Sequence, residues 1–161
     1  MNNISKIKAF GLLLFGASFF TVCSAQTPPQ KEALTSKSEV QHFNFENMKS
    51  ETISEGITRK WFHGDKGQMT IFNLEKDSHI PWHQHPNEQI TYIMSGKVKI
   101  KTIINGEEEF VIVSAGEVIV FPENVPHEFW ALEKTVDLDV HVPVRQDWLS
   151  KELPDYLSKS K

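Results

Sequence analysis

Short apolar runs separated by turn-forming residues repeat along the chain from His42 onward, and this rhythm limits the fold more than any other feature. The runs have the length of strands rather than of core helices, so the pattern is typical of an all-β sandwich or barrel. Asn105-Gly106 provides a two-residue hairpin turn, because both residue types accept positive φ. The strands predicted from this pattern are 57–63, 68–74, 89–94, 97–104, 109–113, 117–121, 128–132 and 136–142.

A short C-terminal helix is expected after the last predicted strand. Residues 145–156 end the domain, and 146–149 have the composition of a helix start. Pro154 would interrupt such a helix, because proline lacks the backbone donor that a helix interior needs. The side chains expected to pack the helix onto the β-structure are Trp148, Leu149, Leu153 and Tyr156.

The first 25 residues have the pattern of a secretory signal peptide. Lys6 and Lys8 precede a mostly apolar stretch, and small residues follow up to Ala25, where we expect cleavage. The stretch is short for a membrane span, although an uncleaved anchor is the alternative. Cys23 raises the alternative of a lipoprotein, but the bulky Val22 before it disfavours lipidation.

These features predict a periplasmic or secreted protein built from three segments. They are a signal peptide (1–25), a polar flexible linker (26–40) and one domain (41–161). No membrane contact is expected once the signal has been removed.

Charge and cysteine content narrow the function classes. The chain has 17 basic and 21 acidic residues, and loss of 1–25 removes two lysines and no acids, leaving a net charge of −6. An acidic exported protein is a poor candidate for nucleic-acid binding. The single cysteine lies in the signal, so the mature protein is expected to have neither a disulfide nor a thiolate ligand.

Three histidines and one glutamine have the spacing of a metal site. His83 and His85 are two residues apart, so their side chains point the same way only on an extended strand. Gln89 and His127 complete the candidate set. Neutral imidazole is the commonest protein metal ligand, and these donors suit one divalent ion, with Ni, Zn, Fe and Mn all open. The alternative is that these are isolated surface or core histidines.

These residues resemble the two sequence motifs of the cupin superfamily. The first motif, G-x5-HxH-x3,4-E-x6-G, is matched by His83, His85, Gln89 and Gly96, with Gln89 in place of glutamate and Asp77 in place of the first glycine. The second, G-x5-P-x-G-x2-H-x3-N, is matched by Gly116, Pro122 and His127, whereas Asn124 and Ala131 depart from it. The resemblance implies a small antiparallel, jelly-roll-like cupin β-barrel with the metal inside its mouth. Strand alternation and the motif spacing both favour Gln89 over its neighbour Glu88 as the ligand.

Two longer segments resemble the KdgF-type cupins, which linearise unsaturated uronates. Residues 83–96 are similar to their HxHPxEQ-x-x-Y-x-x-x-G segment, which carries a His-His-Gln-His metal site. Residues 138–149 are similar to their L-D-x-F-x-P-x-R-x-D-[FW]-L segment, with His141 replacing the phenylalanine. The resemblance implies that Asp139 and Arg145 are catalytic, and His141 is a candidate beside them.

General chemistry supports part of this assignment. A guanidinium can bind a uronate carboxylate through two hydrogen bonds, and the chain has only two arginines, Arg145 and the weaker candidate Arg59. Asp139 and His141 are two residues apart and share one strand face. The alternatives are an ion pair between Arg145 and Asp147, a structural role for Asp139 and a packing role for His141.

The function expected from these features is ring opening of 4,5-unsaturated uronate monosaccharides to keto sugars, during degradation of pectin-, alginate- or ulvan-like polysaccharides. One alternative is a cupin dioxygenase with a non-haem metal, and another is a non-enzymatic sugar-binding cupin. Trp82 and Trp130 flank the ligand segments and are candidates to line the pocket. The arm 42–48 offers a route to a homodimer.

Overall fold

The computed structural model describes residues 39–150. The chain divides into two units, 1–40 and 41–161. The predicted signal peptide and almost all of the predicted linker lie outside the described residues. Within the described part, no helix has the length and apolar character needed to cross a membrane.

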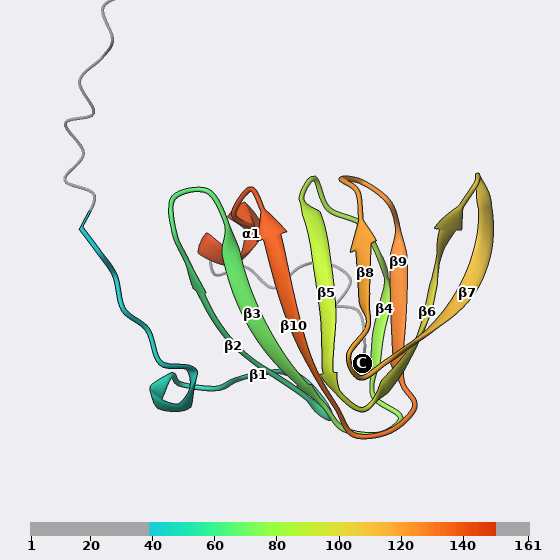
Figure 1. Ribbon diagram of the computed structural model, residues 1–161, viewed down its shortest axis with the longest axis horizontal. Coiled ribbons are helices and arrows are strands. Elements are labelled where there is room, and N and C mark those ends of the chain that lie inside the picture. Colours follow the sequence, from blue (N-terminus) through green and yellow to red (C-terminus); the bar gives the residue numbers. More distant parts are fainter. Residues whose placement is uncertain (1–38, 151–161) are drawn as a thin grey trace, which may run out of the picture. The chain divides into compact units, whose positions relative to one another are not determined.

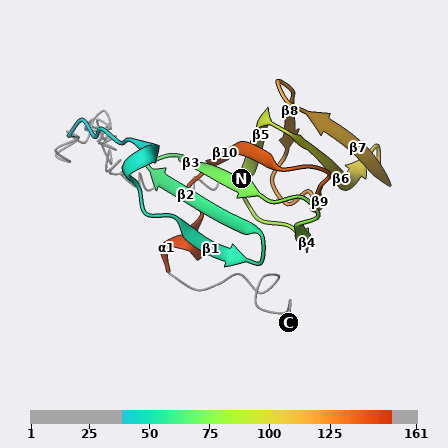
Figure 2. The same cartoon turned by 90° about the horizontal axis from the view of Figure 1, so that it is seen from below.

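Two antiparallel sheets make up the described domain (Figure 1). One has six strands in the order β1-β2-β3-β10-β5-β8, and the other has four in the order β4-β9-β6-β7. Figure 2 shows β1, β2 and α1 on one side of the domain and β6 and β7 on the other. The strands are β1 Glu51–Ser54, β2 Ile57–His63, β3 Gln68–Leu74, β4 His79–His83, β5 Glu88–Ser95, β6 Lys97–Ile104, β7 Glu107–Ser114, β8 Val118–Phe121, β9 His127–Ala131 and β10 Thr135–Val142.

The eight predicted strands are all present, and the sequence analysis missed β1 and β4. β1 is short and mostly polar, so it has no apolar run to reveal it. β4 contains Pro81, which argues against a central strand. It lies at the edge of its sheet, where proline costs fewer ladder hydrogen bonds.

The apolar core lies between the two sheets. Its buried members are Ile57, Phe72, Leu74, Ile93, Val98, Ile100, Val113, Phe121, Phe129, Ala131 and Trp148. This packing of two sheets through their inner faces confirms the all-β, jelly-roll-like fold.

Near the end of the sheets that holds the histidines, polar side chains face inward and apolar side chains face outward, the reverse of the usual arrangement. On β10 the inward residues Asp137, Asp139 and His141 are buried, whereas the outward Leu138 and Val140 are only partly buried. Burying polar groups costs free energy unless they are paired or used. A strand that places them inside and apolar residues outside therefore indicates a functional interior.

The predicted short helix is present as α1, Gln146–Leu149. Its Trp148 is buried and packs edge-on against Trp61 and Phe72, with ring centroids 5.5 and 6.1 Å away. Leu149 is exposed, so the expectation that it also packs is wrong. Leu153 and Tyr156 lie outside the described residues. Within the described chain, Trp148 is thus the apolar anchor of α1.

Candidate metal centre and catalytic pocket

Three histidines meet where β4 and β9 pair. His83 ends β4 and lies opposite His127, the first residue of β9, with ring centroids 4.4 Å apart. His85 is not on a strand as expected, because β4 ends at His83 and a loop leads to β5. The Asn124 backbone amide donates to the carbonyl of His85 at 2.9 Å, which ties this loop to the one before β9. The candidate ligand atoms of the three histidines all lie within 4.8 Å of one another.

Backbone carbonyls orient two of the three rings. His83 Nδ1 lies 2.7 Å from the Pro81 carbonyl, and His127 Nδ1 lies 2.9 Å from that of Val125. A carbonyl only accepts, so both Nδ1 atoms donate and the lone pair is on Nε2. His127 Nε2 is buried without a hydrogen-bond partner in the described chain. A metal ion would satisfy it, so these residues fit a divalent ion.

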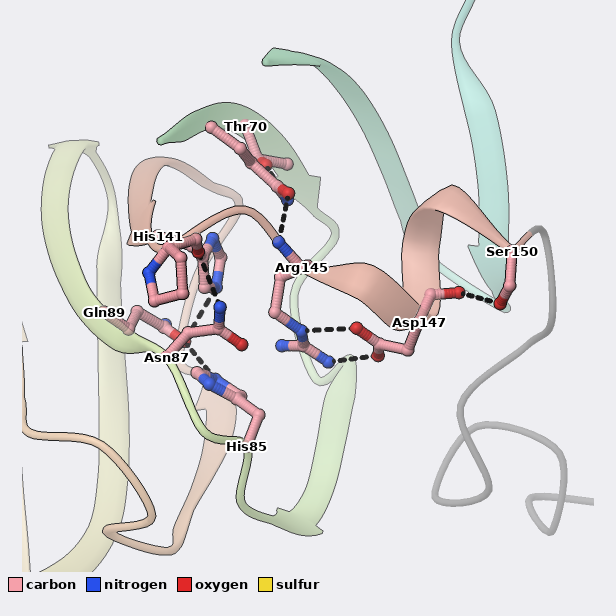
Figure 3. A network of polar contacts seen from close by, with 10 residues as sticks. Thr70, His85, Asn87, Gln89, His141, Arg145, Asp147 and Ser150 are labelled. Atoms are coloured by element: carbon pink, nitrogen blue, oxygen red, sulfur yellow. Dashed lines mark hydrogen bonds and ion pairs between the residues drawn. The ribbon is translucent and has the colours of Figure 1, made fainter. Parts of the chain in front are cut away.

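Gln89 joins this cluster to the interior of the six-stranded sheet. Its Nε2 donates to Thr91 Oγ1 at 2.9 Å and to Asp139 Oδ2 at 3.1 Å. Oε1 therefore faces the other way, 3.0 Å from His85 Nε2 and 3.1 Å from His141 Nε2 (Figure 3). An amide oxygen beside three imidazoles is a suitable fourth ligand. Glu88 is exposed while Gln89 is buried, so the predicted choice between the two agrees with the strand geometry.

Burial keeps the imidazoles of this region neutral, which leaves their lone pairs available to a metal. It lowers the pKa of His83 and of His141 to about 2, with neighbouring positive groups adding to the effect. It lowers the pKa of His85 and of His127 to about 4, although their hydrogen bonds oppose the shift.

Two buried carboxyls lie side by side on the inner face of β10. Burial raises the pKa of Asp139 to about 7, although hydrogen bonds from Thr91 and Gln89 oppose the shift. Burial and then the nearby Asp139 charge raise the pKa of Asp137 well above its usual value. A carboxyl with a pKa of about 7 can both donate and accept a proton at neutral pH. Asp137 was not predicted from the sequence, although its i, i+2 spacing from Asp139 was the available signal.

Arg145 makes the ion pair that the sequence analysis kept as an alternative. Its Nε and Nη2 contact the two carboxylate oxygens of Asp147 at 2.9 and 2.6 Å (Figure 3). Burial raises the pKa of Asp147, but the hydrogen bonds from Arg145 outweigh it and the net shift is downward. Arg145 is buried, and its backbone amide donates to Gln68 Oε1 at 3.1 Å. One edge of its guanidinium is therefore occupied.

A small cavity extends from His83 and His141 into the domain. It is lined by Ile53, Ile57, Arg59, Phe72, Ile80, His83, Gln89, Phe129, Asp137, Asp139, His141, Arg145 and Trp148. Trp82 and Trp130 do not line it: Trp82 is exposed, and Trp130 stacks on His79 at 5.2 Å. Trp148, which was expected only to pack the helix onto the β-structure, lines the cavity instead.

Comparison with known proteins identifies the class. Residues 70–142 match the family described as the cupin domain. Together with the two-sheet fold, this match establishes that the chain contains a cupin domain, as the resemblance of its motifs predicted. No curated protein matches the chain.

Several solved structures resemble this chain in fold. The chain is similar to KdgF from Halomonas sp., with a TM-score of 0.60 and 24% identity over 67% of this chain and 99% of that one. An RmlC-like cupin from Shewanella frigidimarina gives 0.60 and 22% over 68% and 96%. Oxalate decarboxylase from Bacillus subtilis gives 0.60 and 17% over 67% and 33%. At these identities the likeness establishes a shared fold.

Proposed function

We propose that this protein is a metal-dependent cupin enzyme that opens the ring of 4,5-unsaturated uronate monosaccharides to give keto sugars. The observation that carries the proposal is the position of Gln89, whose amide oxygen faces the histidines while its nitrogen donates to Asp139. The candidate ligands His83 and Gln89 and the candidate proton-transferring residue Asp139 line the same cavity. The similarity to KdgF from Halomonas sp. supports the same reading.

The reaction needs proton transfer and no oxidant. The bond between the anomeric carbon and the ring oxygen breaks, the anomeric hydroxyl loses a proton, and C4 of the enol gains one. Asp139 is suited to move these protons, because its pKa of about 7 leaves both forms populated at neutral pH. A metal held by the three histidines and Gln89 would supply Lewis-acid polarisation of substrate oxygens.

An ultraviolet assay tests the proposal. Purified, metal-replete protein incubated with 4,5-unsaturated galacturonate should remove the absorbance of the conjugated double bond well above the buffer rate. Asp139→Asn should slow this by about 10²-fold or more, the scale of general acid–base catalysis. Metal content measured by mass spectrometry should stay unchanged in Asp139→Asn and fall in Gln89→Ala. A rate equal to buffer with metal bound would refute the function.

A dioxygenase is the second candidate, because three neutral imidazoles around one point also suit a non-haem iron. Oxygen uptake separates the two, since ring opening consumes none. Uptake with phenolic or diketone substrates by the iron-loaded protein, without loss of the uronate absorbance, would favour the dioxygenase.

We also propose that the reaction takes place outside the cytoplasm. The support is the signal-like composition of residues 1–25. Intact-mass measurement of protein from the periplasm or medium should find a chain that begins at Gln26. A full-length chain in the cytoplasm would contradict export and would leave the catalytic proposal unaffected.

A further inference from the structure

We propose that Arg59, rather than Arg145, binds the substrate carboxylate. The identity of that substrate rests on the proposed function, whereas the binding of a carboxylate rests on the site itself. Arg59 lies on β2, far in sequence from both metal-ligand segments, yet it lines the same cavity as Gln89 and His141. Arg59 is buried, and only 8% of its surface is exposed to solvent.

The hydrogen bonds of Arg59 leave one edge of its guanidinium available. Nε donates to Glu51 Oε2 at 2.9 Å, and this carboxylate oxygen also accepts from Trp61 Nε1 at 3.3 Å. Within residues 39–150, no hydrogen bond is formed by the terminal nitrogens Nη1 and Nη2 of Arg59. Two parallel donors on a planar group match the two oxygens of a carboxylate.

Arg145 is the weaker carboxylate binder, because Asp147 already contacts two of its nitrogens, Nε and Nη2. Glu51 contacts Arg59 through Nε alone and is itself largely exposed, so it leaves the terminal pair of nitrogens to a ligand. The two arginines of the domain thus differ in which guanidinium nitrogens bind a carboxylate of the protein itself. Arg59 uses Nε alone, whereas Arg145 uses Nε and Nη2.

Trp148 holds Arg59 in place and relates it to the metal centre. The Arg59 Cζ lies 3.8 Å from the centroid of the indole, a stacked cation–π contact. The same indole lies 5.6 Å from the His141 ring, measured between centroids. A carboxylate bound by Arg59 would therefore place the rest of a small sugar ring toward His141 and Gln89.

The remaining charged groups of the cavity permit an anion there. Asp137 and Asp139 also line it, but in the described chain neither forms a hydrogen bond or an ion pair with Arg59. Arg59 pairs with Glu51 through Nε, so its terminal nitrogens remain for an incoming carboxylate.

Binding measurements on metal-replete protein test the proposal without turnover. Calorimetric titration with galacturonate and with neutral galactose should give clearly tighter binding of the acid by the wild type. Arg59→Gln should weaken galacturonate binding at least tenfold and leave galactose binding unchanged. The matched control is Lys60→Gln, which removes the same charge from the outer side of the same strand and should change neither. Arg59→Lys, which keeps the charge without the fork, should give an intermediate affinity.

Steady-state kinetics separate this proposal from the proposed function. In the ultraviolet assay, Arg59→Gln should raise KM much more than it lowers kcat, with unchanged metal content, whereas a merely structural defect would lower kcat and metal content together. Arg59-dependent galacturonate binding without turnover would overturn the function and support the arginine assignment. Turnover with an unchanged KM in Arg59→Gln would overturn the arginine assignment and leave the function standing.

Discussion

Gln89 has two roles that depend on which way its amide lies. Thr91 and Asp139 accept from its nitrogen, so its oxygen is turned toward His85 and His141. A glutamate at this position would lose both donated hydrogen bonds and place a second negative charge beside Asp139. The amide instead stabilises the ionised form of Asp139, which opposes the rise in its pKa that burial causes.

Buried histidines should make the metal-free protein sensitive to acid. In the unfolded chain they take up protons below pH ~6.5, whereas in the fold they stay neutral until about pH 4 or lower. The unfolded state then binds more protons, so the free energy of unfolding falls as the pH drops through this window. Asp137 and Asp139 act in the opposite direction, because their raised pKa values let the folded state hold extra protons. Four imidazoles outnumber two carboxyls, so we expect net destabilisation between about pH 6.5 and 4.

Replacing one of these histidines should reduce the pH dependence of the free energy of unfolding, because the unfolded chain then takes up one proton fewer. His141→Phe removes one of the four groups and should lower the slope by up to about 1.4 kcal/mol per pH unit. Urea unfolding at a series of pH values measures the slope. His63→Phe, which replaces an exposed histidine, is the control. An unchanged slope in His141→Phe would contradict a neutral, buried His141.

At the scale of elements, the tight turn between β5 and β6 depends on one glycine. Gly96 has a φ of +84°, and a Cβ there would overlap the Lys134 carbonyl oxygen and the Thr135 hydroxyl. Gly116 has a similar φ of +88°, but a Cβ would meet nothing. The two positions therefore separate backbone strain from steric overlap.

Alanine substitutions at these two glycines should differ in cost. Gly116→Ala should lower the free energy of unfolding by about 1 kcal/mol, from positive φ alone. Gly96→Ala should cost at least about 2 kcal/mol more, because backbone atoms of the loop before β10 must move. Urea unfolding of both variants measures the difference. Equal losses would show that the approach of Lys134 and Thr135 to Gly96 does not limit the turn.

The inverted pattern of β10 also leaves an apolar surface on the whole domain. On the outer side of the six-stranded sheet, paired outward residues of β3, β10, β5 and β8 are almost all apolar. They are Met69, Ile71, Ile90, Tyr92, Met94, Val118, Val120, Val136, Leu138, Val140 and Val142. Apart from Glu88 at one end, no outward residue of these strands is charged. Phe43 and Phe45 of the N-terminal arm pack on Phe62 of β2, so the arm contacts its own chain beside this face.

We expect a second copy of this chain to cover that face. Four strands about 4.8 Å apart, each up to about 26 Å long, give a projected area on the order of 500 Å². The accessible area exceeds the projection and approaches the roughly 600 to 1,000 Å² that each partner of a standard interface buries. The face is uncharged and apolar, so two copies meet without like-charge repulsion. An anionic lipid surface suits it less, because the chain carries a net charge of −4.

Light scattering after size exclusion should therefore give twice the mass of one chain. Val120→Glu, on the outer face of β8, should give a monomer. Ile112→Glu is the matched control, since Ile112 is equally an exposed apolar strand residue but lies on β7 of the other sheet. A monomeric wild type at tens of micromolar, or dissociation by Ile112→Glu alone, would contradict this interface.

Local pattern predicted most of the fold. A strand exposes alternate side chains to opposite faces, so runs such as Gln68–Leu74 could be read directly from the chain. The residue types that could bind a metal were also evident, because His83, His85, Gln89 and His127 are spaced as ligands. β4 and β1 were missed where proline or polar residues masked the pattern.

The partners of those residues depend on packing between distant segments. The sequence alone left Arg145 open between substrate and Asp147, and the structure places it against Asp147. It ranked Arg59 second, and the structure brings Arg59 into the cavity by stacking it on Trp148. Alternation is a property of each strand, so it is written in the local sequence. The packing of β2, β10 and α1 against one another decides which side chains share the cavity. These elements are far apart in the chain, so no local sequence pattern predicts that contact.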